Sequence, residues 1–220
     1  MYRKLNPKWR YPAALLAVYA VAWVALAIDP LYRQDWLLEN MLVAVAVPLL
    51  VATAKRLRFS DFTYTCLFVF FLVHAVGAHY TYSLVPYDEW IQAATGASLD
   101  GALGFARNHY DRLVHFLYGL LITPAAVEIF AHYGRYPRSW AALFPFLFMV
   151  AHSTIYELIE YAAALVFGGD LGQAYLGTQG DIWDGHKDMA LAMAGSAITI
   201  LILAAAGRLP VRRAPGDGAA

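Results

Sequence analysis

The chain has 220 residues, of which 60% are hydrophobic and 15% charged, and its formal net charge is zero. Soluble domains carry roughly 45–50% apolar and about 25% charged residues, so this composition excludes a soluble globular domain. The neutral balance gives no basis for a nucleic-acid partner. The single cysteine, Cys66, excludes an internal disulfide.

Six stretches of the sequence are apolar and long enough to cross a membrane, which takes about 20 helical residues. The second is short unless its helix begins near Trp36 and carries Glu39 in its first turn. We therefore predict an all-α, polytopic membrane protein. A single bundle of six transmembrane helices is expected over residues 1–213, followed by a disordered tail at 214–220. The stretches are Tyr11–Ile28, Asn40–Ala54, Phe62–Leu84, Leu113–Ala131, Trp140–Phe167 and Met189–Gly207.

The basic residues indicate the orientation, because cytoplasmic loops carry an excess of Lys and Arg. Twelve of the 16 basic residues fall on one side of the predicted membrane, which places both termini in the cytoplasm. The long loops 85–110 and 168–187 then face outward, and the first can include a short helix on the membrane surface. The twelve are Arg3, Lys4, Lys8, Arg10, Lys55, Arg56, Arg58, Arg135, Arg138, Arg208, Arg212 and Arg213.

Acidic and histidine side chains occur where the spans should be apolar, although a charged group there costs roughly 2.5–3.5 kcal/mol. They lie at the outer starts of the helices that contain the fourth and sixth spans and inside the fifth span, which places them at the outer surface or in the outer half of the membrane. We predict that they form one outward-facing site. The expected metal ligands are Asp111, His115, Glu160, Asp184 and Asp188, and the expected catalytic residues are Glu160, Glu157 and Arg112.

Several of these residues also have a structural interpretation. Asp111 and Asp181 each lie three residues after a capping residue type, so both fit a capping box, which we prefer for Asp181. Asp184 and Asp188 suit a solvated first helical turn, and Arg112 or Lys187 suits a structural ion pair. No cap explains Glu157 and Glu160, one turn apart inside an apolar helix. Two such carboxylates need a cation, a shared proton or a basic partner.

Three segments resemble the YjdF-like bacterial inner-membrane proteins. They are Asp111-Arg-Leu-Val-His115-Phe, Tyr156-Glu-Leu-Ile-Glu160 and Tyr175-Leu-Gly-Thr-Gln-Gly-Asp-Ile-Trp-Asp184. The resemblance covers nearly the whole chain and implies a place in the bacterial cytoplasmic (inner) membrane, without implying a reaction. The order of the motifs is also remotely similar to VanZ-like proteins. Relative to that pattern, Arg112 replaces a Lys, Glu160 a Gln and Asp188 an Asn, and the changes add two acids.

Three functions fit these residues. The first is a divalent-cation site that binds or acts on an envelope or lipid-linked substrate, since oxygen-rich sets with a histidine suit Mg²⁺, Mn²⁺, Zn²⁺ or iron. The second is a non-catalytic membrane scaffold or tolerance factor with a structural polar core. The third is a small proton-coupled transporter that uses Glu157 and Glu160 as a relay. The spacing matches no established metal signature.

Overall fold

The computed structural model describes residues 7–134, 136 and 140–209, and in this part of the chain every regular element is a helix. The predicted disordered tail at 214–220 lies outside the described residues. The helices are α1 (Pro7–Leu26), α2 (Arg33–Thr53), α3 (Asp61–Tyr80), α4 (Tyr87–Thr95), α5 (Leu99–Leu103), α6 (Tyr110–Tyr133), α7 (Trp140–Phe167), α8 (Gly169–Leu176) and α9 (Asp184–Ala205).

Six of the described helices, α1, α2, α3, α6, α7 and α9, are long and apolar enough to cross a membrane. The predicted all-α class and the six spans are therefore confirmed. The second span is longer than its apolar stretch, because α2 begins at Arg33 and includes both Trp36 and Glu39. The fifth span has the predicted bounds. Large apolar side chains such as Val21 and Val166 remain exposed on the outside of the bundle, as expected of surfaces that contact lipid.

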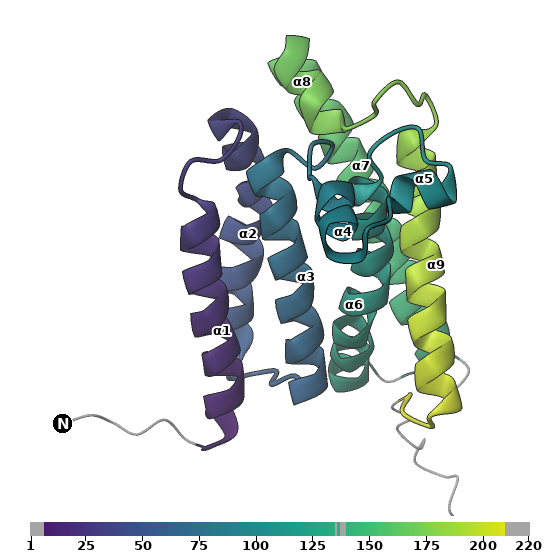
Figure 1. Cartoon of the computed structure of the whole chain (residues 1–220). Helices are drawn as coiled ribbons and strands as arrows, with labels where there is room; N and C mark the ends of the chain where they lie inside the picture. Colours follow the sequence, from purple (N-terminus) through teal and green to yellow (C-terminus); the bar gives the residue numbers. More distant parts are fainter. Residues whose placement is uncertain (1–6, 135, 137–139, 210–220) are drawn as a thin grey trace, which may run out of the picture.

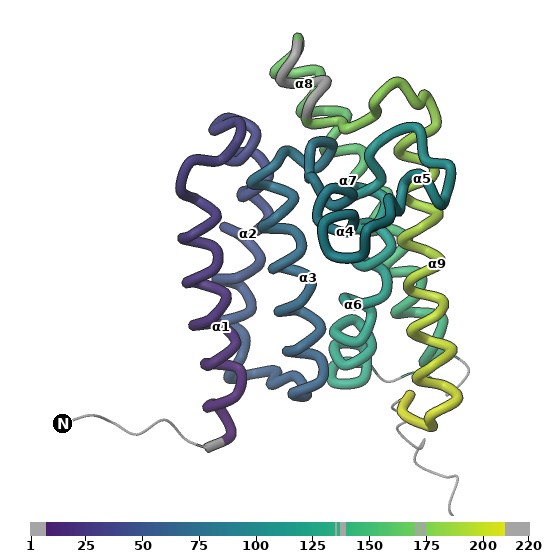
Figure 2. Tube along the Cα trace, viewed as in Figure 1, coloured from purple at the N-terminus to yellow at the C-terminus, as the bar shows by residue number. Residues whose placement is uncertain are grey.

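The bundle has two parts that meet between α3 and α6. Helices α1 and α2 pack on α3, while α7 and α9 pack on α6 and on each other. The beginning of α1 and the end of α9 lie at one end of the bundle, and α4, α5 and α8 lie at the other (Figure 1). The Cα trace in Figure 2 follows the chain from α3 through α4 and α5 into α6. The short helix predicted within 85–110 is therefore present, as the pair α4 and α5.

The contact between α6 and α9 depends on two glycines. A Cβ atom on Gly119 would lie 1.9 Å from the carbonyl oxygen of Ala192, and one on Gly195 would lie 2.2 Å from that of Phe116. Small residues let membrane helices approach this closely. Hydrogen bonds join the same faces, from Thr123 Oγ1 to Ser196 Oγ (2.9 Å) and from Thr199 Oγ1 to the Leu120 carbonyl (2.6 Å). This contact holds the first turns of α6 and α9 side by side.

Candidate functional site

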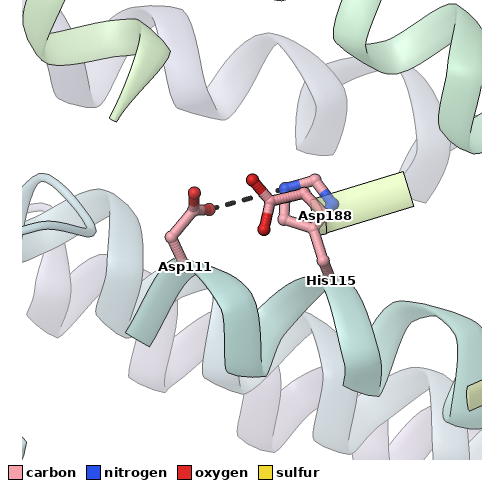
Figure 3. A group of neighbouring side chains, drawn as sticks. All are labelled: Asp111, His115 and Asp188. Atoms are coloured by element: carbon pink, nitrogen blue, oxygen red, sulfur yellow. Dashed lines mark ion pairs between the residues drawn. The ribbon is translucent and has the colours of Figure 1, made fainter. Parts of the chain in front are cut away.

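The first turns of α6 and α9 bring two carboxylates to one imidazole. One ligand atom each from Asp111, His115 and Asp188 lies within 4.8 Å of the others (Figure 3). Asp111 and His115 are one turn apart on α6, and His115 Nε2 lies 3.5 Å from Asp111 Oδ1. Asp188 comes from α9, so the α6–α9 contact is what completes this set.

Helix α7 supplies a second set that shares the same imidazole. One ligand atom each from His115, Glu157 and Glu160 lies within 4.8 Å of the others. His115 Nδ1 is 3.6 Å from Glu157 Oε1, so the two ring nitrogens face carboxylates from different helices. A Cβ atom at Gly185 would lie 2.6 Å from Glu157 Oε2, so a larger residue there would displace the end of the Glu157 side chain. We call Asp111, His115, Glu157, Glu160 and Asp188 the acidic cluster.

The acidic cluster is largely buried, and its one basic side chain is the imidazole of His115. The exposed fraction is 2% for Asp188 and 8% for both His115 and Glu160. Asp188 Oδ1 and Glu157 Oε1 are inaccessible and have no hydrogen-bond partner. Within the described ranges, no arginine or lysine forms an ion pair with any of the four carboxylates. Buried carboxylates in this arrangement require a bound cation or protons.

Asp184 lies beside the acidic cluster in a group of ion pairs. Its Oδ1 accepts hydrogen bonds from Arg107 Nη2 (2.6 Å) and Arg112 Nη2 (3.2 Å), and the carboxylate is 2% exposed. Arg112 also donates to Asp181 Oδ2 (2.5 Å). The two arginines therefore occupy Oδ1 of the carboxylate that we predicted as a metal ligand, while its Oδ2 is buried without a hydrogen-bond partner. The ion pairs of Arg112 join it to residues before and at the start of α9, and none joins it to Glu160 among the described contacts.

The capping interpretation is wrong for both Asp111 and Asp181. The residue before α6 is His109 and the residue before α9 is Trp183, and neither makes a side-chain cap. Asn108 Oδ1 accepts from the Tyr110 amide (2.9 Å), but the Asn108 amide donates to Gln179 Oε1 and not to Asp111. Asp111 contacts His115 instead. Asp181 precedes α9, where its Oδ1 accepts from the Trp183 amide (3.0 Å) and its Oδ2 from Lys187 Nζ (2.6 Å). Lys187 thus has the structural ion pair that we expected.

The pKa of the Asp181 carboxyl lies well below its ordinary value, because Lys187, the Trp183 amide and Arg112 all donate to the ionised form. A lowered pKa stabilises the fold above the unfolded-state pKa, near 3.9, and the contribution is lost as the pH falls through the folded-state value. We expect Asp181→Asn to lower the Tm equally at about pH 7 and pH 5, with the difference from wild type shrinking only below about pH 4. Thermal unfolding across this range, with exposed Glu89→Gln as the control, checks this; a difference that shrinks between pH 7 and 5 contradicts it.

Two charged residues near the site were not predicted to belong to it. Glu39 of α2 is 7% exposed, its Oε2 has no hydrogen-bond partner, and it is close enough to feel the charges of Asp111 and His115. Its place inside an apolar span was the available signal. Arg107, in the loop before α6, gave no such signal. His79, near the end of α3, is not part of the acidic cluster; its Nδ1 lies 2.9 Å from the Leu26 carbonyl oxygen.

A bundle of six apolar helices with a buried acidic cluster near one end defines an integral, multi-pass membrane protein. The chain belongs to the DUF2238 family of predicted membrane proteins, which matches residues 11–208. It is also 35% identical over 206 residues to the inner membrane protein YjdF of Escherichia coli (strain K12), covering 93% of each chain. No solved structure matches. The YjdF-like resemblance is thereby confirmed, while the remote similarity to VanZ-like proteins stays a prediction.

Proposed function

We propose that this protein spans the inner membrane and holds one divalent cation in its acidic cluster, on the outward side, to bind or act on an envelope or lipid-linked molecule. The observation that carries the proposal is His115, whose imidazole is shared by the two carboxylate sets. Because the two sets meet at one ring through different nitrogens, they lie side by side, and a single cation would occupy one of them at a time.

The ligand types support a cation of the Mg²⁺, Mn²⁺, Zn²⁺ or iron class, since these bind carboxylate oxygens with or without imidazole nitrogen. Asp188 Oδ1 and Glu157 Oε1 have no other partner and would gain one. A bound cation of this kind polarises a carbonyl or phosphoryl oxygen. Arg112, fixed by Asp181 and Asp184 beside the cluster, adds a positive charge that suits an anionic headgroup. Glu157 and Glu160 are then placed to accept or hold a proton.

Metal analysis tests the proposal directly. We expect detergent-purified wild type to retain a divalent cation, or to bind added Mn²⁺ or Zn²⁺ at one site per chain. Glu160→Gln keeps the size of the side chain and removes one ligand charge, so the affinity should fall by roughly tenfold or more. Glu89→Gln changes an exposed acid outside the cluster and should leave the affinity unchanged. Wild type that binds none of these ions contradicts the proposal and favours a structural polar core.

The orientation is part of the proposal and has its own test. Reporter fusions after Arg58, Arg138 and Arg213 are expected to read cytoplasmic, and fusions within 85–110 and 168–180 external, because the basic residues lie mainly on one side. The α4, α5 and α8 end of the bundle, next to the acidic cluster, then faces outward. The opposite reading at 85–110 would place the cluster toward the cytoplasm.

A further inference from the structure

An elongated cavity of about 240 Å³ runs from the acidic cluster into the bundle. Asp111 and His115 line it at one end, and Phe59 and Ile129 line it near the other. Asp111 and Ile129 both belong to α6 and are eighteen residues apart, which corresponds to roughly 27 Å along a helix. The cavity is therefore long and narrow, and it reaches from the cluster end of the bundle almost to the other end.

Beyond the acidic cluster, the walls of the cavity are mainly apolar, and four of their polar side chains form two hydrogen-bonded pairs. Tyr118 and His152 are hydrogen-bonded to each other (2.6 Å) and stacked, and Tyr82 is hydrogen-bonded to His74. These pairs satisfy their own polar atoms, so the wall offers little to a hydrophilic ligand. Among the described residues that line it, Ser153 has a buried Oγ without a partner.

Helices α2 and α7 both contribute to the walls of the cavity. Helix α2 packs against α3, while α7 packs against α6, α8 and α9. Both helices also expose apolar side chains that do not line the cavity, such as Val45 on α2 and Ile155 on α7. An apolar cavity at this depth is surrounded by hydrocarbon chains, so its natural occupant comes from the lipid phase.

We infer that the cavity takes the hydrocarbon chain of an amphiphile with a single chain and an anionic headgroup, such as an alkyl or isoprenyl phosphate. The headgroup lies at the acidic cluster and the chain extends along α6, between α2 and α7. This names the substrate class of the proposed cation site and therefore rests on the proposed function. A volume below the roughly 300–1,000 Å³ of usual small-molecule sites and an elongated shape suit one chain better than two.

Photo-labelling tests the inference with a long-chain alkyl phosphate that carries a diazirine in the middle of its chain. In purified protein with Mn²⁺ present, we expect the label on cavity residues such as Ile122 and Phe148. Ser153→Leu fills the cavity and should reduce labelling roughly tenfold or more, because room for even one methylene group matters in an apolar pocket. Ser153→Ala leaves the cavity open and should label as wild type does. Ala46→Leu, at a lining residue of α2, gives the same block if Ser153→Leu does not purify.

Three comparisons decide the outcome. The inference is overturned if the label is confined to residues on the lipid-facing surface of the bundle, such as Leu165, and if its amount is the same in both filling variants as in wild type. Equal cavity labelling by a two-chain phosphatidate with the same diazirine overturns the single-chain claim. Metal binding is measured on the same samples. Cation binding without cavity labelling rejects the chain site alone, whereas cavity labelling of protein that binds none of the added ions rejects the proposed cation.

Discussion

Gly119→Ala is expected to separate α6 from α9 and to destabilise the bundle by about 3 kcal/mol or more. This is at the upper end of the range for substitutions that overpack a core. The added Cβ atom would lie 1.9 Å from a backbone oxygen of Ala192, which cannot move away as a side-chain tip could. Gly195 is packed as closely against the Phe116 carbonyl oxygen, so neither helix can shift to make room for the added atom. Thermal unfolding in detergent measures the effect.

The same substitution should weaken the site, because Asp188 reaches His115 only through the α6–α9 contact. Cation affinity is therefore expected to fall together with Tm. Ala194→Val is the matched control, since it adds bulk to an exposed position of α9 and should leave both properties unchanged. A Gly119→Ala protein with wild-type Tm and affinity would show that the two helices do not need this contact.

Glu160→Gln is expected to raise the stability of the metal-free protein, or leave it level, while it weakens cation binding. A buried carboxylate that lacks its cation costs free energy, and the amide removes that charge at constant size. If Glu160 were instead the partner of Arg112, the change would leave a buried guanidinium unpaired and cost about 3–5 kcal/mol. Arg112 pairs with Asp181 and Asp184, so we expect metal-free Glu160→Gln to be at least as stable as metal-free wild type.

Thermal unfolding of wild type and Glu160→Gln in chelator measures that sign. Adding Mn²⁺ should then reverse the order, because bound ligand stabilises the folded state in proportion to its affinity. A variant that is less stable than wild type in chelator, by the amount expected for a lost ion pair, would assign Glu160 a structural role.

The spans were predictable because apolar length is a local property of the sequence, and the acidic cluster was partly predictable because charges inside such spans are conspicuous. Helical spacing placed Asp111 with His115, and Glu157 with Glu160. Which helices meet was not predictable from that spacing. Helices α6 and α9 approach closely because Gly119 and Gly195 have no side chains, and this contact brings Asp188 to His115.

The ion pairs of Asp184 show a second limit of prediction from the sequence. Its spacing from Asp188 suggested one shared role, but the partner that decides its role, Arg107, comes from a distant loop. The capping prediction for Asp181 failed for a related reason. Ion pairs with Arg112 and Lys187 hold that carboxylate before the helix starts, and a local motif cannot report such contacts.

The closure of the cluster by α9 has a consequence for biogenesis. A chain is synthesised from its N-terminus, and the segments made first are the first that can fold. Helices α1, α2 and α3 can therefore assemble early, while the carboxylate of Asp188 arrives only with the sixth span. A nascent chain held before that insertion already contains His115, Glu157 and Glu160 but lacks the carboxylate from α9. Cation loading through the set of Asp111, His115 and Asp188 should accordingly follow insertion of the sixth span.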